Sequence, residues 1–252
     1  MKLAVINFSG NVGKSTVARH LLAPRIPGAH VIAVESVNAT DAPAMTIRGR
    51  QFDQLQEYLQ TASDVVVDVG ASNVEDLLAL MRRYRGSHED FDAFIVPTVP
   101  ARKQQLDTAA TLSELARIGV CAQRIRLLFN QVEDHTRVDQ VFETLLAYCA
   151  ASGTVHPRLD ACLRFNEVYA RLRLSDQTLL ELATDPTDYK GRIAAAASQA
   201  EKLALAQKLA TQRLARGVLP ELDACFSGLD LAGLADAAKL QAVAIKAAAH
   251  DS

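Results

Sequence analysis

Aromatic residues are scarce in this sequence: tryptophan is absent, and phenylalanine and tyrosine together supply only 5% of the 252 positions. So few aromatic side chains argue against a base-stacking platform for single-stranded nucleic acid. The sequence also lacks a charge excess, because its formal net charge is −2. That balance argues against a globally basic nucleic-acid binder but leaves room for a local basic patch.

Metal-binding and membrane-spanning patterns are lacking too. The four cysteines form no C-x-x-C pair, and the six histidines show no metal-ligand spacing. Free thiols are typical of a cytoplasmic protein, which is the location we expect. No apolar run approaches the roughly 20 residues that a membrane span requires. The apolar start of the chain, residues 2–7, therefore predicts a buried strand rather than a secretory signal.

Hydrophobic residues make up 49% of the sequence, and their spacing alternates between short continuous runs and amphipathic stretches. This alternation predicts an α/β fold, with a mostly parallel sheet and helices on both of its faces. The expected strands are residues 2–7, 30–34, 64–69, 94–96, 126–129 and 155–156. The expected helices are residues 14–22, 46–60, 73–84, 101–118, 138–151, 162–173, 178–183 and 193–215.

The C-terminal part of the chain is mainly helical and rich in alanine and leucine. Residues 217–220 contain Gly217 and Pro220 and are expected to break the helix that precedes them. We divide the chain into a nucleotide-binding domain at residues 1–190 and a helical C-terminal extension at residues 191–252.

The strongest chemical signal lies between the first expected strand and the first expected helix, where a P-loop must lie. It reads Ser9, Gly10, Asn11, Val12, Gly13, Lys14, Ser15, Thr16. Such a turn aims backbone N–H groups at phosphate oxygens, and the helix N-terminus adds the positive end of its dipole. Lys14 is then expected to reach the β- and γ-phosphates, and the Ser15 hydroxyl to bind Mg²⁺. The sequence departs from the strict P-loop pattern at its first glycine, where it has Phe8. The alternative to a P-loop is an ordinary glycine turn before a helix.

A second element supports a phosphate site. Asp68 ends the run Val65-Val66-Val67-Asp68, and the carboxyl ends of parallel strands meet at the ligand crevice. We expect Asp68 to hold Mg²⁺ directly or through water. The alternative is a solvated acid that caps the following helix, a role that Ser72 or Asn73 would also fill.

These motifs, with F-I-V-P-T-V-P at 94–100 and F-N-Q at 129–131, resemble the ParA/MinD group of deviant Walker A ATPases over roughly residues 1–190. Within that group, the opening K-L-A-V-I-N-F-S-G-N-V-G-K-S-T most resembles the StbB-type stability proteins of conjugative plasmids. The resemblance implies a P-loop NTPase fold, ATP and Mg²⁺ as ligands, and Lys14, Glu35 and Asp68 as catalytic residues. It also implies that Asn130 and Pro157 contact the base, although both also suit plain turn or strand-ending positions.

The chain departs from the group at two positions. The group's signature lysine, which reaches across a nucleotide-sandwich dimer, falls at Ser9. The second acid of its D-x-D strand end falls at Val37, although Glu35 fits the first. We therefore expect slow hydrolysis without a partner. Because Asn130 to Glu133 match a guanine-reading motif poorly, we expect ATP rather than GTP.

The leading functional interpretation is a ParA-like ATPase in plasmid or DNA stability, positioning or conjugation. The partners it implies are a small DNA-binding adaptor protein, nonspecific DNA and a nucleotide-dependent homodimer. The alternatives are a P-loop small-molecule kinase or ligase, and a nucleotide-binding interaction module with little hydrolysis. The basic residues Arg82, Arg83 and Arg85, near a helix C-terminus, suit the helix dipole without any ligand.

Overall fold

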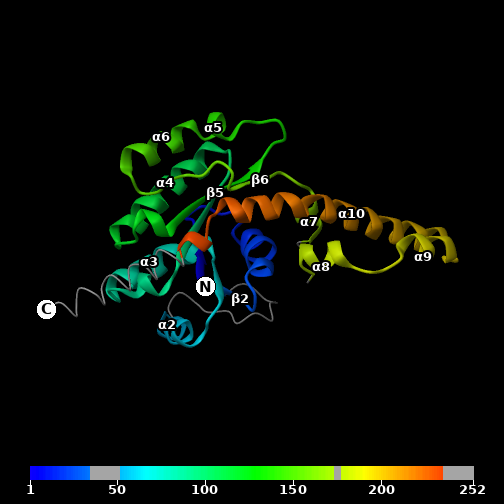
Figure 1. The fold of residues 1–252 in the computed structure, drawn as a ribbon, viewed down its shortest axis with the longest axis horizontal. Helices are drawn as coiled ribbons and strands as arrows, with labels where there is room; N and C mark the ends of the chain where they lie inside the picture. The colour runs from blue at the N-terminus through cyan, green and yellow to red at the C-terminus, as the bar shows by residue number, and fades with distance from the viewer. Residues whose placement is uncertain (35–51, 173–176, 235–252) are drawn as a thin grey trace.

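A single parallel sheet of six strands organises the molecule in a computed structural model, which describes residues 1–34, 52–172 and 177–234 (Figure 1). The strand order is β2-β3-β1-β4-β5-β6, and every neighbouring pair runs parallel. The strands are β1 (Lys2–Val5), β2 (His30–Val34), β3 (Val65–Val69), β4 (Ala93–Thr98), β5 (Ile125–Val132) and β6 (Cys162–Arg164). The predicted α/β class is thereby confirmed.

Helices connect the strands and cover the sheet. The α-helices are α1 (Lys14–Thr16), α2 (Phe52–Thr61), α3 (Val74–Arg83), α4 (Arg102–Arg117), α5 (Val138–Val141), α6 (Glu143–Ser152), α7 (Val168–Leu172), α8 (Leu179–Thr184), α9 (Tyr189–Ala195) and α10 (Gln199–Gly228). Helix α1 continues as a π-helical stretch, η1 (Val17–Leu22), and short 3₁₀ segments are η2 (Ala23–Arg25), η4 (Ala71–Asn73), η5 (Ser87–Asp90) and η6 (Ala122–Arg124).

Two hydrophobic cores lie on opposite faces of the sheet. Alternate strand residues point to opposite faces, so Ala4 and Ile6 join one core while Leu3 and Val5 join the other. The first core is completed by α2, α3, α4 and α6, and the second by η1, α7, α8 and α10. Because both faces are covered, β3 is buried at all five of its positions.

Helix α10 contradicts the predicted break at residues 217–220, because it runs unbroken through Gly217 and Pro220. A proline inside a helix costs about 3 kcal/mol. Here the residues around it are buried in the second core: Ala215, Val218, Leu222 and Cys225 are at most 3% exposed. Their burial offsets the cost, since each large apolar side chain contributes roughly 1.5–3 kcal/mol.

The amino-terminal half of α10 has different neighbours. It packs with α8 and α9, and these three segments form a helical arm that extends beyond the sheet (Figure 1). The predicted single helix at 193–215 is thus two helices, and the Ser198 side chain begins the second by accepting a hydrogen bond from the Glu201 backbone N–H at 3.2 Å.

The last strand was also predicted at the wrong place. Residues 155–156 lie outside any strand, and β6 lies at Cys162–Arg164, where a helix was expected; α7 begins only at Val168. Backbone hydrogen bonds set this edge: Phe129 N–H donates to Ala161 O and Phe165 N–H donates to Val132 O, both at 2.9 Å. No helix among the described residues is long and apolar enough to cross a membrane.

Candidate functional site

The predicted P-loop leads from the end of β1 into α1. Gly13 has a φ of 86° and Asn11 a φ of 59°, so two residues of this turn adopt the left-handed conformation. Glycine adopts it without steric cost, and asparagine tolerates it better than most residues. The turn therefore forms although its first glycine is replaced by Phe8.

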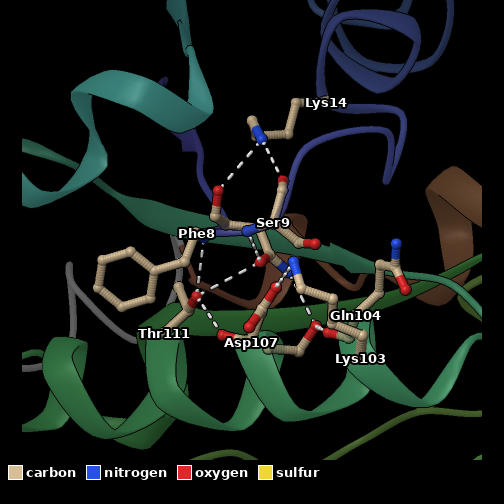
Figure 2. A network of polar contacts seen from close by, with 9 residues as sticks. Phe8, Ser9, Lys14, Lys103, Gln104, Asp107 and Thr111 are labelled. Atoms are coloured by element: carbon tan, nitrogen blue, oxygen red, sulfur yellow. Dashed lines mark hydrogen bonds and ion pairs between the residues drawn. The ribbon is translucent and has the colours of Figure 1, made fainter.

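Lys14 lies inside the loop and is only 8% exposed. Its Nζ donates to the carbonyl of Ser9 at 2.7 Å and to that of Asn7 at 3.1 Å (Figure 2). Burial lowers the pKa of Lys14 to about 8, and the negative charge of Asp68 opposes this shift. The ammonium group is thus held against the loop by the backbone oxygens of Asn7 and Ser9.

Helix α4 supports the loop from below, which the sequence analysis did not predict. The buried Asn7 side chain donates from Nδ2 to Thr108 Oγ1 at 2.8 Å and accepts the Ser9 N–H at 2.8 Å. One turn further along α4, Thr111 Oγ1 accepts the Phe8 N–H at 3.1 Å (Figure 2). The signal in the sequence was a polar Asn7 at the end of an apolar strand, together with threonines three residues apart on one helix face.

Asn130 reaches the loop from β5. Its Nδ2 donates to the Val12 carbonyl at 2.8 Å, and its Oδ1 accepts the Gln131 N–H at 2.9 Å. The neighbouring side chain also bonds to the loop backbone: Gln131 Nε2 donates to Asn11 O at 3.2 Å. Asn130 is 4% exposed, so this amide is part of the packed wall of the P-loop.

Asp68 and Ser15 carry side-chain oxygens of the type that Mg²⁺ prefers as ligands. Asp68 is 5% exposed near the end of β3 and pairs in register with Val5, immediately before the loop. Ser15 is exposed on α1, which contacts β3. A carboxylate and a hydroxyl suit Mg²⁺, which typically takes few protein ligands and completes its shell with water and phosphate. Within the described residues, no three histidine, cysteine or acidic side chains gather as a metal site.

The remaining predicted residues are placed unevenly. Gly10 is exposed at the outer edge of the loop, and Thr16 is half-buried at the end of α1. Pro157 is half-buried in the connection between α6 and β6. Glu35 lies outside the described residues, as does Val37.

Comparison with known proteins points to no function. No protein-family profile and no curated protein matches the sequence. Among solved structures, the chain is similar to an McdA variant from Cyanothece in complex with ATP, at 14% identity and a TM-score of 0.44. The match covers 83% of this chain and 96% of that one. The function proposed below therefore rests on the geometry of the loop and on the resemblance of its motifs.

Proposed function

We propose that the protein binds Mg²⁺-ATP at the P-loop and hydrolyses it slowly, as a ParA-like nucleotide-dependent switch. The observation that carries this proposal is the placement of Lys14, whose buried ammonium group lies between the Ser9 and Asn7 carbonyls. A cation held inside a loop of backbone N–H groups at a helix N-terminus is arranged for a phosphate chain.

Each residue of the site has a role in this proposal. Lys14 exchanges its two carbonyl partners for phosphate oxygens, and residues 10–16 supply backbone N–H groups. Ser15 and Asp68 hold Mg²⁺, which neutralises phosphate charge when bound. We assign Asn130 to positioning the loop, because its amide is bonded to Val12 O and to the Gln131 N–H. Contacts of Glu35, Asn130 and Pro157 with a water or a base stay predictions.

Slow turnover follows from the loop itself. Phosphoryl transfer requires neutralised charge and a positioned water molecule. Ser9 occupies the position of the signature lysine of the ParA/MinD group and is 3% exposed. The loop therefore carries one cation, Lys14, where members of that group carry two. A single cation in the loop favours a switch, in which the bound nucleotide selects a conformational or assembly state, over an enzyme that hydrolyses ATP rapidly. An interaction module with little hydrolysis is the second candidate, on the same observation.

The biological setting comes from the resemblance alone. We propose a role in plasmid or DNA stability, positioning or conjugation, in the manner of StbB-type proteins. A small DNA-binding adaptor, nonspecific DNA and a nucleotide-dependent homodimer are the partners it implies, in the cytoplasm. Residues 1–190 would carry the nucleotide and residues 191–252 would extend from it.

The test is calorimetric titration of Mg²⁺-ATP into the wild-type protein and the Lys14→Ala variant. We expect the variant to lose binding while its circular dichroism spectrum is unchanged. Lys103→Ala is the matched control, because that lysine lies on α4 with an 82% exposed side chain and, within the described part of the chain, its ion pair is with Asp107 at 3.6 Å. Equal ATP affinity in wild type and Lys14→Ala would refute the P-loop assignment.

A further inference from the structure

The helical arm contains a cleft of about 670 Å³ that no part of the proposed nucleotide site uses. This volume lies within the range of ligand-binding cavities, roughly 300–1,000 Å³. The lining residues come from α7 to α10 and from the short segment before α8: Arg171, Leu172, Gln177, Leu182, Tyr189, Ala204, Gln207, Lys208 and Thr211. None of them belongs to the P-loop, so the cleft is a separate feature of the molecule.

The floor of the cleft is apolar. Leu172, Leu182 and Tyr189 are 4%, 8% and 7% exposed, and they come from three different helices. The Tyr189 hydroxyl donates to Asp185 Oδ2 at 2.6 Å, so its polar end already has a partner and its ring is left to line the cleft. The floor is therefore held in place by its own packing and hydrogen bonds.

The opposite wall is one face of α10. Residues 204, 207, 208 and 211 follow the i, i+3, i+4, i+7 spacing of neighbouring side chains on a helix. Leu203, which borders this face, is 58% exposed, and Leu180 on α8 is 38% exposed. Exposed apolar side chains therefore also occur on two of the helices that line the cleft, α8 and α10.

The charge of the lining has one sign. Among the residues that the structure describes, Arg171 and Lys208 are the charged lining residues, and none of the lining side chains is acidic. Arg171 Nη1 donates to Thr211 Oγ1 at 3.2 Å, which orients its guanidinium along the wall. Lys208 is exposed and takes part in none of the ion pairs found among the described residues. On the same arm, the Asp185 carboxylate accepts hydrogen bonds from the Tyr189 and Thr187 hydroxyls.

We propose that this cleft binds an acidic, amphipathic segment of a partner protein. Apolar side chains of that segment would cover Leu172, Leu182 and the ring of Tyr189, while its carboxylates would pair with Arg171 and Lys208. Amphipathic helices commonly bind grooves in this way, through anchors spaced along one face. A nucleic-acid backbone fits less well, because it offers nothing apolar to the floor or to Leu203.

The test uses two short fluorescein-labelled peptides, one of leucine and glutamate and one of leucine and lysine in the same order. Fluorescence anisotropy with the full chain should show at least tenfold tighter binding of the acidic peptide. Lys208→Glu should weaken that binding tenfold or more. Lys202→Glu, a control on the same helix but about 200° around it from Ala204, should change it less than threefold.

A second pair of variants tests the cleft without changing charge. Ala204→Trp fills the cleft and should abolish binding, whereas Ala206→Trp lies outside the lining and should preserve it. Both variants are accepted only if their circular dichroism matches wild type. Equal binding of the two peptides, or equal effects of the paired variants, overturns the proposal. Tighter binding of a short DNA duplex than of the acidic peptide, lost in Lys208→Glu, would overturn it in favour of nucleic acid.

Discussion

Asn130, on β5, donates a hydrogen bond to the P-loop, with its Nδ2 2.8 Å from the carbonyl oxygen of Val12. The contact requires glycine at the next position, because a Cβ added to Gly13 would lie 2.2 Å from the same Nδ2. Residue 13 must also adopt a φ of 86°. Gly13 is therefore required for two reasons, its positive φ and the close approach of Asn130. The loop keeps this glycine although Phe8 stands at the first glycine position of the motif.

The first prediction separates a positioning role for Asn130 from a base-reading role. If Asn130 holds the loop, Asn130→Ala weakens the binding of ATP, GTP and inorganic tripolyphosphate alike, by about tenfold each, because its two side-chain hydrogen bonds are lost. If Asn130 reads the base, tripolyphosphate binding is unchanged. Competition against a fluorescent nucleotide measures all three. Gln131→Ala is the comparison, and because Gln131 is more exposed and its bond is longer, 3.2 Å, the expected loss is smaller.

The second prediction concerns two glycines of the same loop. Gly13→Ala should lower the free energy of unfolding by about 2 kcal/mol, from the positive φ and the contact with Asn130, and should abolish nucleotide binding. Gly10→Ala should be tolerated by the fold, because a Cβ at that position meets nothing within 4 Å. Urea unfolding measures both variants. Equal midpoints would mean that the loop rearranges to accept the added methyl group.

The third prediction follows from the pKa of Lys14, which burial lowers to about 8. As the pH rises from 7 to 9, Lys14 loses its proton, so ATP affinity should fall. Near pH 8 a bound triphosphate restores the ammonium form, and binding should take up protons. Calorimetry in two buffers of different ionisation enthalpy detects that uptake. Lys14→Arg keeps its charge throughout this range, so proton uptake in the variant equal to that of wild type would exclude Lys14 as its source.

Sequence patterns predicted the centre of this molecule better than its edges. Strands such as β3, whose residues are buried on both faces, show as continuous apolar runs, and the P-loop shows as a local motif. The short strand β6 was missed because it has one buried side chain, Leu163, between two half-buried ones. Its position depends on hydrogen bonds to β5, which no local pattern encodes.

The unbroken course of helix α10 through Pro220 and the supports of the P-loop were missed for the same reason. Pro220 favours a break locally, and only the tertiary burial of Val218 and Leu222 reverses that preference. Asn7 and Thr108 lie 101 positions apart in the sequence, so nothing in the sequence links the two residues before the fold brings them together. Long-range contacts decided each of these cases.

His20 gives the last prediction, because it joins the helix after the P-loop to the helical arm. It lies on η1, and its Nδ1 accepts the backbone N–H of Leu179, the first residue of α8, at 3.2 Å. Burial and, to a smaller extent, the positive charge of Arg19 together lower its pKa from 6.5 to about 4. The neutral ring is therefore the form that the folded protein requires.

The expected pH dependence has a definite sign. Between about pH 4 and 6.5 the unfolded chain binds this proton more tightly than the folded one, so stability falls as the pH falls through that window. By about pH 4, protonation of His20 lowers the free energy of unfolding by about 3 kcal/mol. His20→Gln serves as the control, because its amide oxygen can accept the Leu179 N–H without titrating. Urea midpoints between pH 7 and 4.5 should fall more steeply for wild type than for His20→Gln, and parallel curves would show that His20 is not the group that titrates.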